Sequence, residues 1–346
     1  MSVSYWQNKK NKQEYDITII GGGIAGLSCA YWLLKEDQDL QIALVEKHEI
    51  GDGATGRNAG FVTCGSVEHF NRLVSKHGAE EALDIWRFSE TNLALLKQEI
   101  IKEKSESLGF EEKGSFSLAS AESEFAELKK SYELMQKLGI NVEILEQQDV
   151  IDRLGAEHFV GGIKYVNDAS IHPMSLLEEI KRRCLLDRHF HLLENHEVFD
   201  IKSEGENKLI KTKKSDITSP VVVMATNGYS PLIHPYFKEK IFPTRGQILA
   251  TEPVERFMEG PCYANFVLDY FRQLPTGEMI IGGFRQLQKD AEVGYSDETS
   301  DLIQKTLEEF LRKHIPKVSH AKITHRWTGI MGFSVDGQPM IGAIPG

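Results

Sequence analysis

The 346-residue sequence predicts an α/β fold in which a dinucleotide-binding domain is interleaved with a second domain built on a mixed sheet. Three observations predict this fold. An apolar run at residues 17–20 leads through a glycine-rich turn into an apolar helix and a second apolar strand. Short strands then alternate with charged helices, and no linker, repeat or low-complexity tract divides the chain. A βαβ start of this kind begins a doubly wound parallel sheet.

The glycine-rich turn at residues 21–26 reads Gly-Gly-Gly-Ile-Ala-Gly. Gly21 allows a sharp turn off the strand, Gly23 allows close approach to a pyrophosphate, and Gly26 allows the helix to pack on the sheet. Glu46 ends the second strand about 20 residues later, where a carboxylate accepts hydrogen bonds from a ribose diol. Together these features predict a Rossmann-like site. Its expected contacts are Gly21, Gly23, Ile24, Ala25, Gly26, Glu46 and Lys47.

Composition and charge exclude several classes of partner. The formal net charge of -11 argues against nucleic acids and anionic membranes, which require a basic surface. No stretch approaches the roughly 18–20 apolar residues that cross a bilayer. Residues 1–7 lack the apolar core of a signal peptide, so we expect a cytoplasmic protein. The scattered cysteines show neither a CxxC pair nor a histidine at metal-ligand spacing, and they predict reduced thiols and no metal site: Cys29, Cys64, Cys184 and Cys262.

Periodicity places the remaining elements. Helices are predicted over residues 67–104, 122–138, 174–186 and 299–314. Strands are predicted over residues 114–119, 142–145, 247–251 and 339–344, with a hairpin over residues 271–281 around Pro275-Thr276-Gly277. The all-apolar run at residues 221–225 suits a central strand buried on both faces. It ends in Thr226-Asn227-Gly228, at the carboxyl edge where ligands bind in open α/β sheets.

A second glycine-rich segment follows the second strand. Residues 51–60 read Gly-Asp-Gly-Ala-Thr-Gly-Arg-Asn-Ala-Gly. The segment resembles the Gly-Ala-Ser-Gly-Arg-Asn-Gly-Gly segment of the FAD-dependent amine and amino-acid oxidases of the D-amino-acid oxidase superfamily, which includes glycine and sarcosine oxidases. The likeness is greatest to γ-glutamylputrescine oxidoreductase-type amine oxidases. Further pieces match in the same order, at residues 197–198, 223–228, 243–247, 270–272 and 325–339.

The resemblance implies FAD as the cofactor. It implies non-covalent attachment, because Arg57 stands where some relatives carry a linking histidine, and residues 325–346 contain no cysteine. Arg57 and Asn58 would hold the pyrophosphate or ribityl chain by charge-assisted hydrogen bonds. Val198 and Ala225 fit a core role as well as a contact role. The further FAD contacts that it implies are Gly53, Ala54, Thr55, Arg57, Asn58, Ala59, Gly60, Val198, Ala225, Thr226 and Asn227.

The substrate side departs from the resembled amino-acid oxidases. Those enzymes present an arginine to the substrate carboxylate in a Gly-Leu-Arg-Pro or Gly-Phe-Arg-Pro stretch, and the matching residue here is Met331. Methionine cannot form a bidentate ion pair, so the pattern favours an amine over an α-amino acid. Arg245 and Arg272 are possible substitutes or structural arginines, and Tyr270 either lines the pocket or packs. The predicted substrate contacts are Tyr270, Arg272 and Met331.

The resulting hypothesis is a small-molecule oxidoreductase. A polyamine derivative or secondary amine passes a hydride to flavin N5, the imine hydrolyses, and O2 or another acceptor reoxidises the flavin, with O2 giving hydrogen peroxide. No catalytic residue is assigned, because the amine need only be neutral at the transfer. An amino-acid oxidase remains an alternative. So does a catalytically incomplete flavin-binding or interaction protein, because the resembled family continues into a glycine-rich turn and a helix where this sequence stops at Gly346.

We expect a discontinuous domain division and make no prediction of the oligomeric state. The FAD-binding domain is predicted over residues 15–85, 165–235 and 320–346, and the substrate domain over residues 86–164 and 236–319. An RNA-modifying flavoprotein of the same superfamily is disfavoured by the acidic charge balance.

Overall fold

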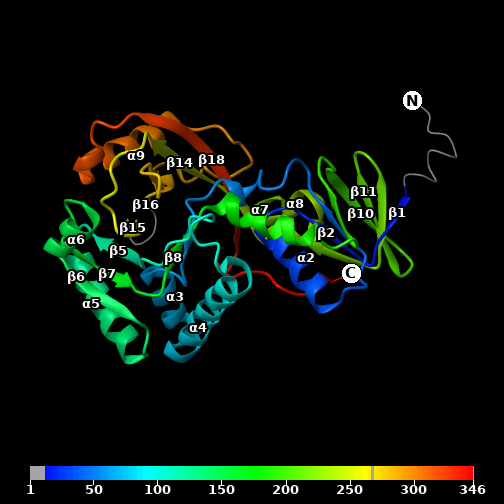
Figure 1. Ribbon diagram of the computed structural model, residues 1–346, viewed down its shortest axis with the longest axis horizontal. Helices are drawn as coiled ribbons and strands as arrows, with labels where there is room; N and C mark the ends of the chain where they lie inside the picture. The colour runs from blue at the N-terminus through cyan, green and yellow to red at the C-terminus, as the bar shows by residue number, and fades with distance from the viewer. Residues whose placement is uncertain (1–11, 266–268, 346) are drawn as a thin grey trace.

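A four-stranded parallel sheet carries the first glycine turn. The computed structural model describes residues 12–265 and 269–345 (Figure 1). The strand order is β13 (Val221–Met224), β2 (Ile17–Ile20), β3 (Ile42–Val45) and β9 (Phe190–Leu193). Helices α2 (Ile24–Glu36) and α7 (Pro173–Cys184) pack on one face, where their apolar side chains join those of β2 and β3 in one buried cluster. The predicted βαβ start is confirmed.

A second four-stranded sheet covers the other face of the parallel sheet. Its order is β1 (Lys12–Glu14), β12 (Asp216–Ser219), β11 (Asn207–Thr212) and β10 (Val198–Glu204). Val198, Ile210 and Ile217 from this sheet pack against Ala43 and Val45 of β3. This part of the molecule therefore has three layers, and the carboxyl edge of the parallel sheet faces the rest of the chain.

The other part of the molecule is built on an eight-stranded mixed sheet. Its order is β18 (Ile323–Ser334), β14 (Ile241–Thr251), β17 (Met279–Gly282), β16 (Asp269–Gln273), β15 (Cys262–Ala264), β5 (Ser115–Ala119), β7 (Gly161–Tyr165) and β6 (Val142–Glu146). One face packs on α6 (Gln147–Leu154) and α9 (Asp301–His314). At the β5–β7–β6 end of the sheet, apolar side chains of the strands form a separate buried cluster with those of three helices: α3 (Val67–His77), α4 (Ala79–Leu96) and α5 (Glu122–Lys137).

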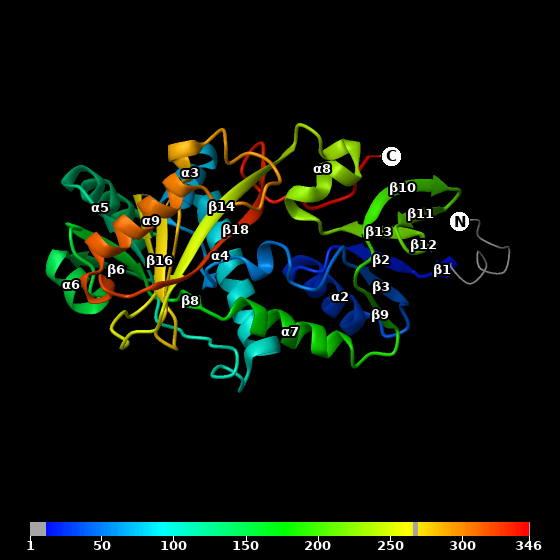
Figure 2. The same ribbon diagram turned by 90° about the horizontal axis from the view of Figure 1, so that it is seen from above.

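Two long strands connect the parts. Figure 2 shows β14 and β18 running as a pair from the eight-stranded sheet toward α8 (Ser230–Ile233). The short pair β4 (Phe61–Val62) and β8 (Ala169–Ser170) lies at the same junction. Single turns of 3-10 helix lie at Ala54–Gly56, Asn227–Tyr229, Pro235–Phe237, Arg285–Gln288 and Pro316–Val318, and a π-helix at Lys97–Ile101 continues α4.

Several sequence predictions change. Strand β13 pairs only with β2 among the described strands, and Val221 is 48% exposed, so the expected central strand is an edge strand. Residues 339–344 form no strand. The final strand is β18, which lies in the eight-stranded sheet. Gly78, at φ +91, separates α3 from α4 within the single helix expected there.

The predicted hairpin is confirmed. The hairpin around Pro275-Thr276-Gly277 pairs β16 with β17 in antiparallel register. All four cysteines are free, and three of them are buried. Within residues 12–265 and 269–345, none of the helices combines the length and the apolar character needed to span a membrane. Residues 1–7 and Gly346, which entered the predictions above, lie outside the described residues.

Candidate functional site

The first glycine turn leaves room for no side chain at two of its positions. Gly21 turns off β2 at φ +112, and a Cβ there would lie 2.4 Å from the carbonyl oxygen of Ala225. A Cβ at Gly26 would lie 1.9 Å from the carbonyl oxygen of Gly21. The turn delivers the chain to the N-terminus of α2, where the N-cap residue Gly23 makes no side-chain hydrogen bond. The N-terminus of this 13-residue helix suits a pyrophosphate.

Glu46 lies against this turn. Its Oε2 accepts a hydrogen bond of 2.7 Å from Gly22 N, and its Oε1 accepts one of 3.0 Å from His48 N. The carboxylate is partly exposed, so its remaining lone pairs can accept hydrogen bonds from a ribose. The neighbouring Lys47 side chain forms an ion pair of 3.2 Å with Glu197.

The second glycine loop is tied to the first and closed on itself. Ile24 N donates to Thr55 Oγ1 at 2.9 Å, which joins the two loops. Asn58 Nδ2 donates to the carbonyl oxygens of Ala54 and Thr55, and its Oδ1 accepts from Gly60 N at 2.7 Å. The side-chain amide of Asn58 thus stabilises the loop by hydrogen bonds to its own backbone, and these bonds use most of its donors and acceptors.

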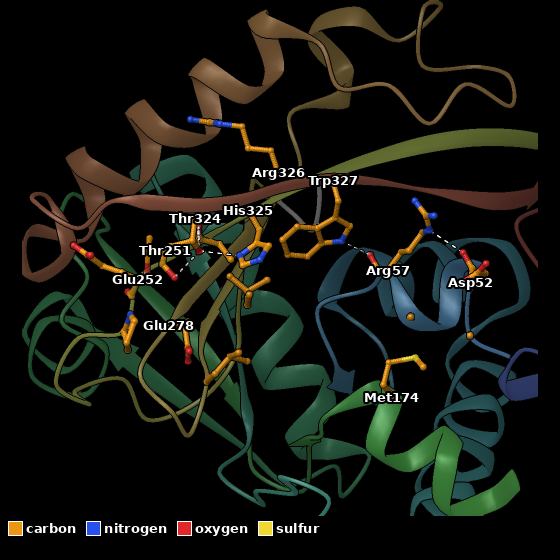
Figure 3. A pocket seen from close by; sticks show the side chains of 16 residues that line it. Asp52, Arg57, Met174, Thr251, Glu252, Glu278, Thr324, His325, Arg326 and Trp327 are labelled. Carbon is orange, nitrogen blue, oxygen red and sulfur yellow. Dashed lines mark hydrogen bonds between the residues drawn. The ribbon is translucent and has the colours of Figure 1, made fainter. Parts of the chain in front are cut away.

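Arg57 joins this loop to the eight-stranded sheet. Its Nε donates to Asp52 O at 2.7 Å and its Nη1 to Thr328 O at 3.1 Å, while Trp327 Nε1 donates to Arg57 O at 3.1 Å (Figure 3). A Cβ at Gly329 would lie 3.0 Å from Arg57 Cβ. The loop therefore crosses β18 between Trp327 and Gly329. The N–H groups of the Arg57 guanidinium that do not form these hydrogen bonds can bind an anion.

Residues after β13 hold the far end of β18. Ala225 N donates to Ile20 O at 2.8 Å, which continues the pairing of β13 with β2. Asn227, at φ +47, donates from Nδ2 to Ile330 O at 3.0 Å and accepts from Gly332 N at 2.9 Å. These two bonds bracket Met331 on the strand. Thr226 pairs its hydroxyl with that of Ser230. The remaining predicted contact, Val198, is 7% exposed within the core.

The register of the eight-stranded sheet shows which side chains of its strands share one face. Tyr270 pairs with Gly282, Gly282 with Ile248, and Ile248 with Trp327, so their side chains share a face. Alternation along β18 adds three further positions to this face: Gly329, Met331 and Phe333. We call this the inner face, because Arg57 of the glycine loop rests on it.

Glycines form a floor at the centre of the inner face. Gly246 pairs with Gly329, and Gly282 lies diagonally next to Gly246. A Cβ at Gly246 would lie 3.0 Å from Met331 Cε, and one at Gly282 would lie 2.4 Å from Tyr270 Oη. The side chains of Met331 and Tyr270 thus extend over this floor from opposite sides. These two predicted substrate residues thus lie on the same face of the sheet, and burial raises the pKa of the Tyr270 phenol.

The third predicted substrate residue is committed to the loop. Arg272 is 2% exposed, and its Nη1 donates to the carbonyl oxygens of Gly60 at 2.7 Å, Ile171 at 3.1 Å and Ala59 at 3.2 Å. Its Nε has no partner in the described part of the chain. Burial lowers the pKa of the guanidinium to about 10. Arg272 fixes the backbone of Ala59 and Gly60, the segment expected to approach the flavin.

Arg245 lies on the opposite, outer face of the sheet. Its Nε and Nη2 donate to the two carboxylate oxygens of Glu292 at 2.7 and 2.8 Å, and Glu292 is 1% exposed. Gln247 and Thr328 follow the same alternation and also face outward. Arg245 is therefore a structural residue, and it does not replace the missing carboxylate clamp.

Sequence reasoning missed Arg285, which follows β17 at the edge of the inner face. Its guanidinium carbon lies 4.3 Å from the centroid of the Phe333 ring. The side chain is half-buried, and burial lowers its pKa while the nearby Tyr270 raises it. No motif in the sequence marks this residue. Only the pairing of β17 with β14, and of β14 with β18, brings it to Phe333.

A cavity of about 780 Å³ opens on the other side of Arg57. Figure 3 shows His325 and Trp327 along one wall, Met174 of α7 on another, and Arg326 pointing away toward the helix above. Of the predicted contacts, Arg57 is among its lining residues, whereas Tyr270, Arg272 and Met331 are not. The loop therefore divides the inner face into this cavity and the region around Met331. Among the described residues, no group of three or more His, Cys, Asp or Glu could hold a metal ion.

Residues 16–346 match the family of FAD dependent oxidoreductases. The probable oxidoreductase OrdL of Haemophilus influenzae is 26% identical over 350 residues, which span 95% of this chain and 76% of OrdL. Sarcosine oxidase subunit beta of Rhodobacter capsulatus is 22% identical over 353 residues, spanning 98% of this chain and 80% of that subunit. The crystal structure of glycine oxidase from Geobacillus kaustophilus has a TM-score of 0.80 at 21% identity, covering 96% of this chain and 86% of that one.

Proposed function

The chain belongs to the family of FAD dependent oxidoreductases, and we propose that it oxidises the C–N bond of a small amine, either a polyamine derivative or a secondary amine. The family membership confirms the resemblance, the mixed α/β fold and FAD as the cofactor. We further propose that FAD is held non-covalently by the residues predicted from the sequence, and that O2 is the electron acceptor, with hydrogen peroxide as the product.

The observation that carries the proposal is Met331. Its thioether lies over Gly246 at the centre of the inner face, where the resembled amino-acid oxidases present an arginine. A thioether is a weak hydrogen-bond acceptor without charge, so it cannot bind a carboxylate at that point. It suits the apolar carbon chain of an amine.

The fit to FAD rests on the glycine turns and on Arg272. Side chains at Gly21 and Gly26 would clash with backbone atoms of the chain, so the tight turn that leads into the N-terminus of α2 requires glycine at both positions. Arg272 holds the carbonyl groups of Ala59 and Gly60 in place, which fixes the backbone of the segment that we expect to approach the flavin. When bound, FAD supplies the oxidising group, which accepts a hydride from the carbon next to the amine nitrogen.

The residues of the inner face act by positioning and by excluding water. Phe61 follows the glycine loop, and its ring lies 5.9 Å from that of Tyr270 in an edge-to-face arrangement. These two rings and Met331 form an apolar wall that holds a neutral amine. Water then hydrolyses the released imine to an aldehyde and an amine or ammonia, and this step needs no side chain of the site.

A substrate panel tests the proposal. FAD-loaded protein is mixed with primary amines, secondary amines, polyamine derivatives and α-amino acids, and loss of the visible flavin absorbance is followed with peroxide release. We expect an amine to give the fastest reduction. Met331→Arg should shift the preference toward α-amino acids, since it restores a fixed fork for a carboxylate. Reduction by α-amino acids alone in the unmodified protein would refute the amine assignment.

A further inference from the structure

We propose that Arg285 binds a carboxylate of the substrate, so that the substrate is an amine that also carries a carboxylate away from the reacting C–N bond. This inference rests on the proposed function and narrows its substrate class. In the resembled amino-acid oxidases an arginine at the position of Met331 binds the substrate carboxylate. Here Arg285, which follows β17 in the same sheet, would bind it instead.

The first observation is the lack of partners around this guanidinium. Arg285 is half-buried, yet it forms no hydrogen bond or ion pair within the part of the chain that the structure describes. Its guanidinium contacts the Phe333 ring. Partial burial weakens the hydration of a cation, and a guanidinium has five N–H donors that favour a planar, two-oxygen acceptor. An unpaired arginine in a partly enclosed position is therefore prepared for an anionic ligand.

The second observation is the location of Arg285. Phe333 lies two residues after Met331 on the same face of β18, and the guanidinium rests against its ring. Tyr270 is close enough to Arg285 to raise its pKa, and Tyr270 contacts Phe61, which follows the glycine loop directly. The aromatic side chains of Phe61 and Tyr270 therefore lie between the expected flavin position and Arg285. A substrate lying along it would place its amine near the loop and its carboxylate at the guanidinium.

The third observation is that none of the carboxylates among the described residues pairs with Arg285 at this end of the face. Asp269, the closest acid along β16, accepts from Phe284 N at 2.7 Å and from Asn265, and it alternates with Tyr270 to the outer face. The guanidinium rests against the Phe333 ring in a cation–π contact, and none of the described residues accepts a hydrogen bond from its N–H groups. A guanidinium held against a ring with free N–H groups supports bidentate binding of a carboxylate.

The test compares two substrates that differ by the carboxylate alone. 4-(Methylamino)butanoate and N-methylbutylamine are each mixed with the FAD-loaded protein, and kcat/KM is measured from flavin reduction. We expect the carboxylate-bearing amine to be preferred roughly 10- to 100-fold, the range for a charge-assisted pair. Arg285→Gln should abolish this preference through KM, and Arg285→Lys should retain part of it. Arg256→Gln, a matched change at an exposed ion pair with Glu111, should leave it intact.

Binding of butanoate, measured by calorimetry, gives a second readout that does not require turnover. We expect Arg285→Gln to weaken it to the same degree as it lowers the substrate preference. Equal kcat/KM values for the two amines in the unmodified protein, or unchanged butanoate affinity in Arg285→Gln, would overturn the inference. If no amine reduces the flavin, the proposed function fails, whereas the butanoate measurement still decides whether Arg285 binds a carboxylate.

Discussion

The arginines on the inner and outer faces of the eight-stranded sheet differ in the partners that their guanidinium groups bind. On the outer face, Arg245 forms a bidentate pair with buried Glu292, and Gln247 Nε2 adds a hydrogen bond to the same carboxylate at 2.9 Å. On the inner face, within the described part of the chain, Arg272 donates to backbone carbonyl groups and Arg285 contacts a ring without a hydrogen-bond partner. On the outer face the charge of Arg245 is paired with a buried carboxylate, whereas on the inner face neither arginine is paired with a carboxylate among the described residues, and Arg285 keeps its N–H groups free for a ligand. Local departures of this kind are expected at functional sites.

Removing the paired arginine should have the largest effect on stability. Arg245→Met leaves the Glu292 carboxylate buried without its cation, which costs about 3–5 kcal/mol of the free energy of unfolding. Urea denaturation of the variant and of the unmodified protein measures the difference. The double variant Arg245→Met with Glu292→Met should recover most of the loss, because neither charge then remains buried. A loss below about 1 kcal/mol in the single variant would show that the pair is not structural.

Removing the buried arginine of the inner face should cost less. Arg272→Met takes a donor from three carbonyl groups, which costs about 1–3 kcal/mol, but it leaves no carboxylate without a partner. Because the backbone of Ala59 and Gly60 loses its anchor, FAD should bind roughly 5- to 10-fold more weakly. Denaturation of the FAD-free protein and titration with FAD measure the two effects separately. A stability loss equal to that of Arg245→Met would remove the distinction between the faces.

The junction behind the inner face contains a buried carboxyl group that makes stability depend on pH. Asp168 accepts from Cys64 N at 3.1 Å and from Ser115 Oγ at 2.6 Å, and burial raises its pKa to about 7. A raised carboxyl pKa stabilises the folded protein below the unfolded pKa of about 3.9, and this contribution is lost as pH rises toward the folded pKa. Unfolding free energy should therefore fall by about 1–2 kcal/mol between about pH 5.5 and pH 7.

The variant Asp168→Asn isolates this contribution, since its side chain does not titrate. The difference in unfolding free energy between the unmodified protein and the variant should shrink or reverse across the same pH window. A difference that is constant with pH would mean that Asp168 keeps its charge in the folded protein.

The sequence predicts those parts of the site that depend on backbone geometry. The turn at residues 21–26 is recognisable because Gly21 and Gly26 have no space for a Cβ, whatever the distant surroundings are. Met331 was found through its place in a family pattern. Arg285 has no such local signature, because its role depends on the register that brings β17 and β18 to the two sides of β14. The edge position of β13 is not predictable for the same reason, since an apolar run does not indicate whether a strand has one or two neighbouring strands in the sheet.

The smallest expected effect on stability is that of a substitution at Gly246, which should change the rate of flavin reduction much more than the free energy of unfolding. Gly246→Ala should change the unfolding free energy by less than about 1 kcal/mol, because the loss of chain entropy in the unfolded state offsets a contact with the flexible end of a side chain. The new methyl group would lie 3.0 Å from Met331 Cε and displace it over the inner face. Flavin reduction by the best amine should then slow roughly tenfold, since small misplacements of a bound substrate are costly. In a Met331→Ala background the same change should have little further effect, as a double-mutant cycle would show. An unchanged rate in the single variant would mean that the substrate does not lie over Gly246, and the inner face would then lose its assignment as the site of oxidation.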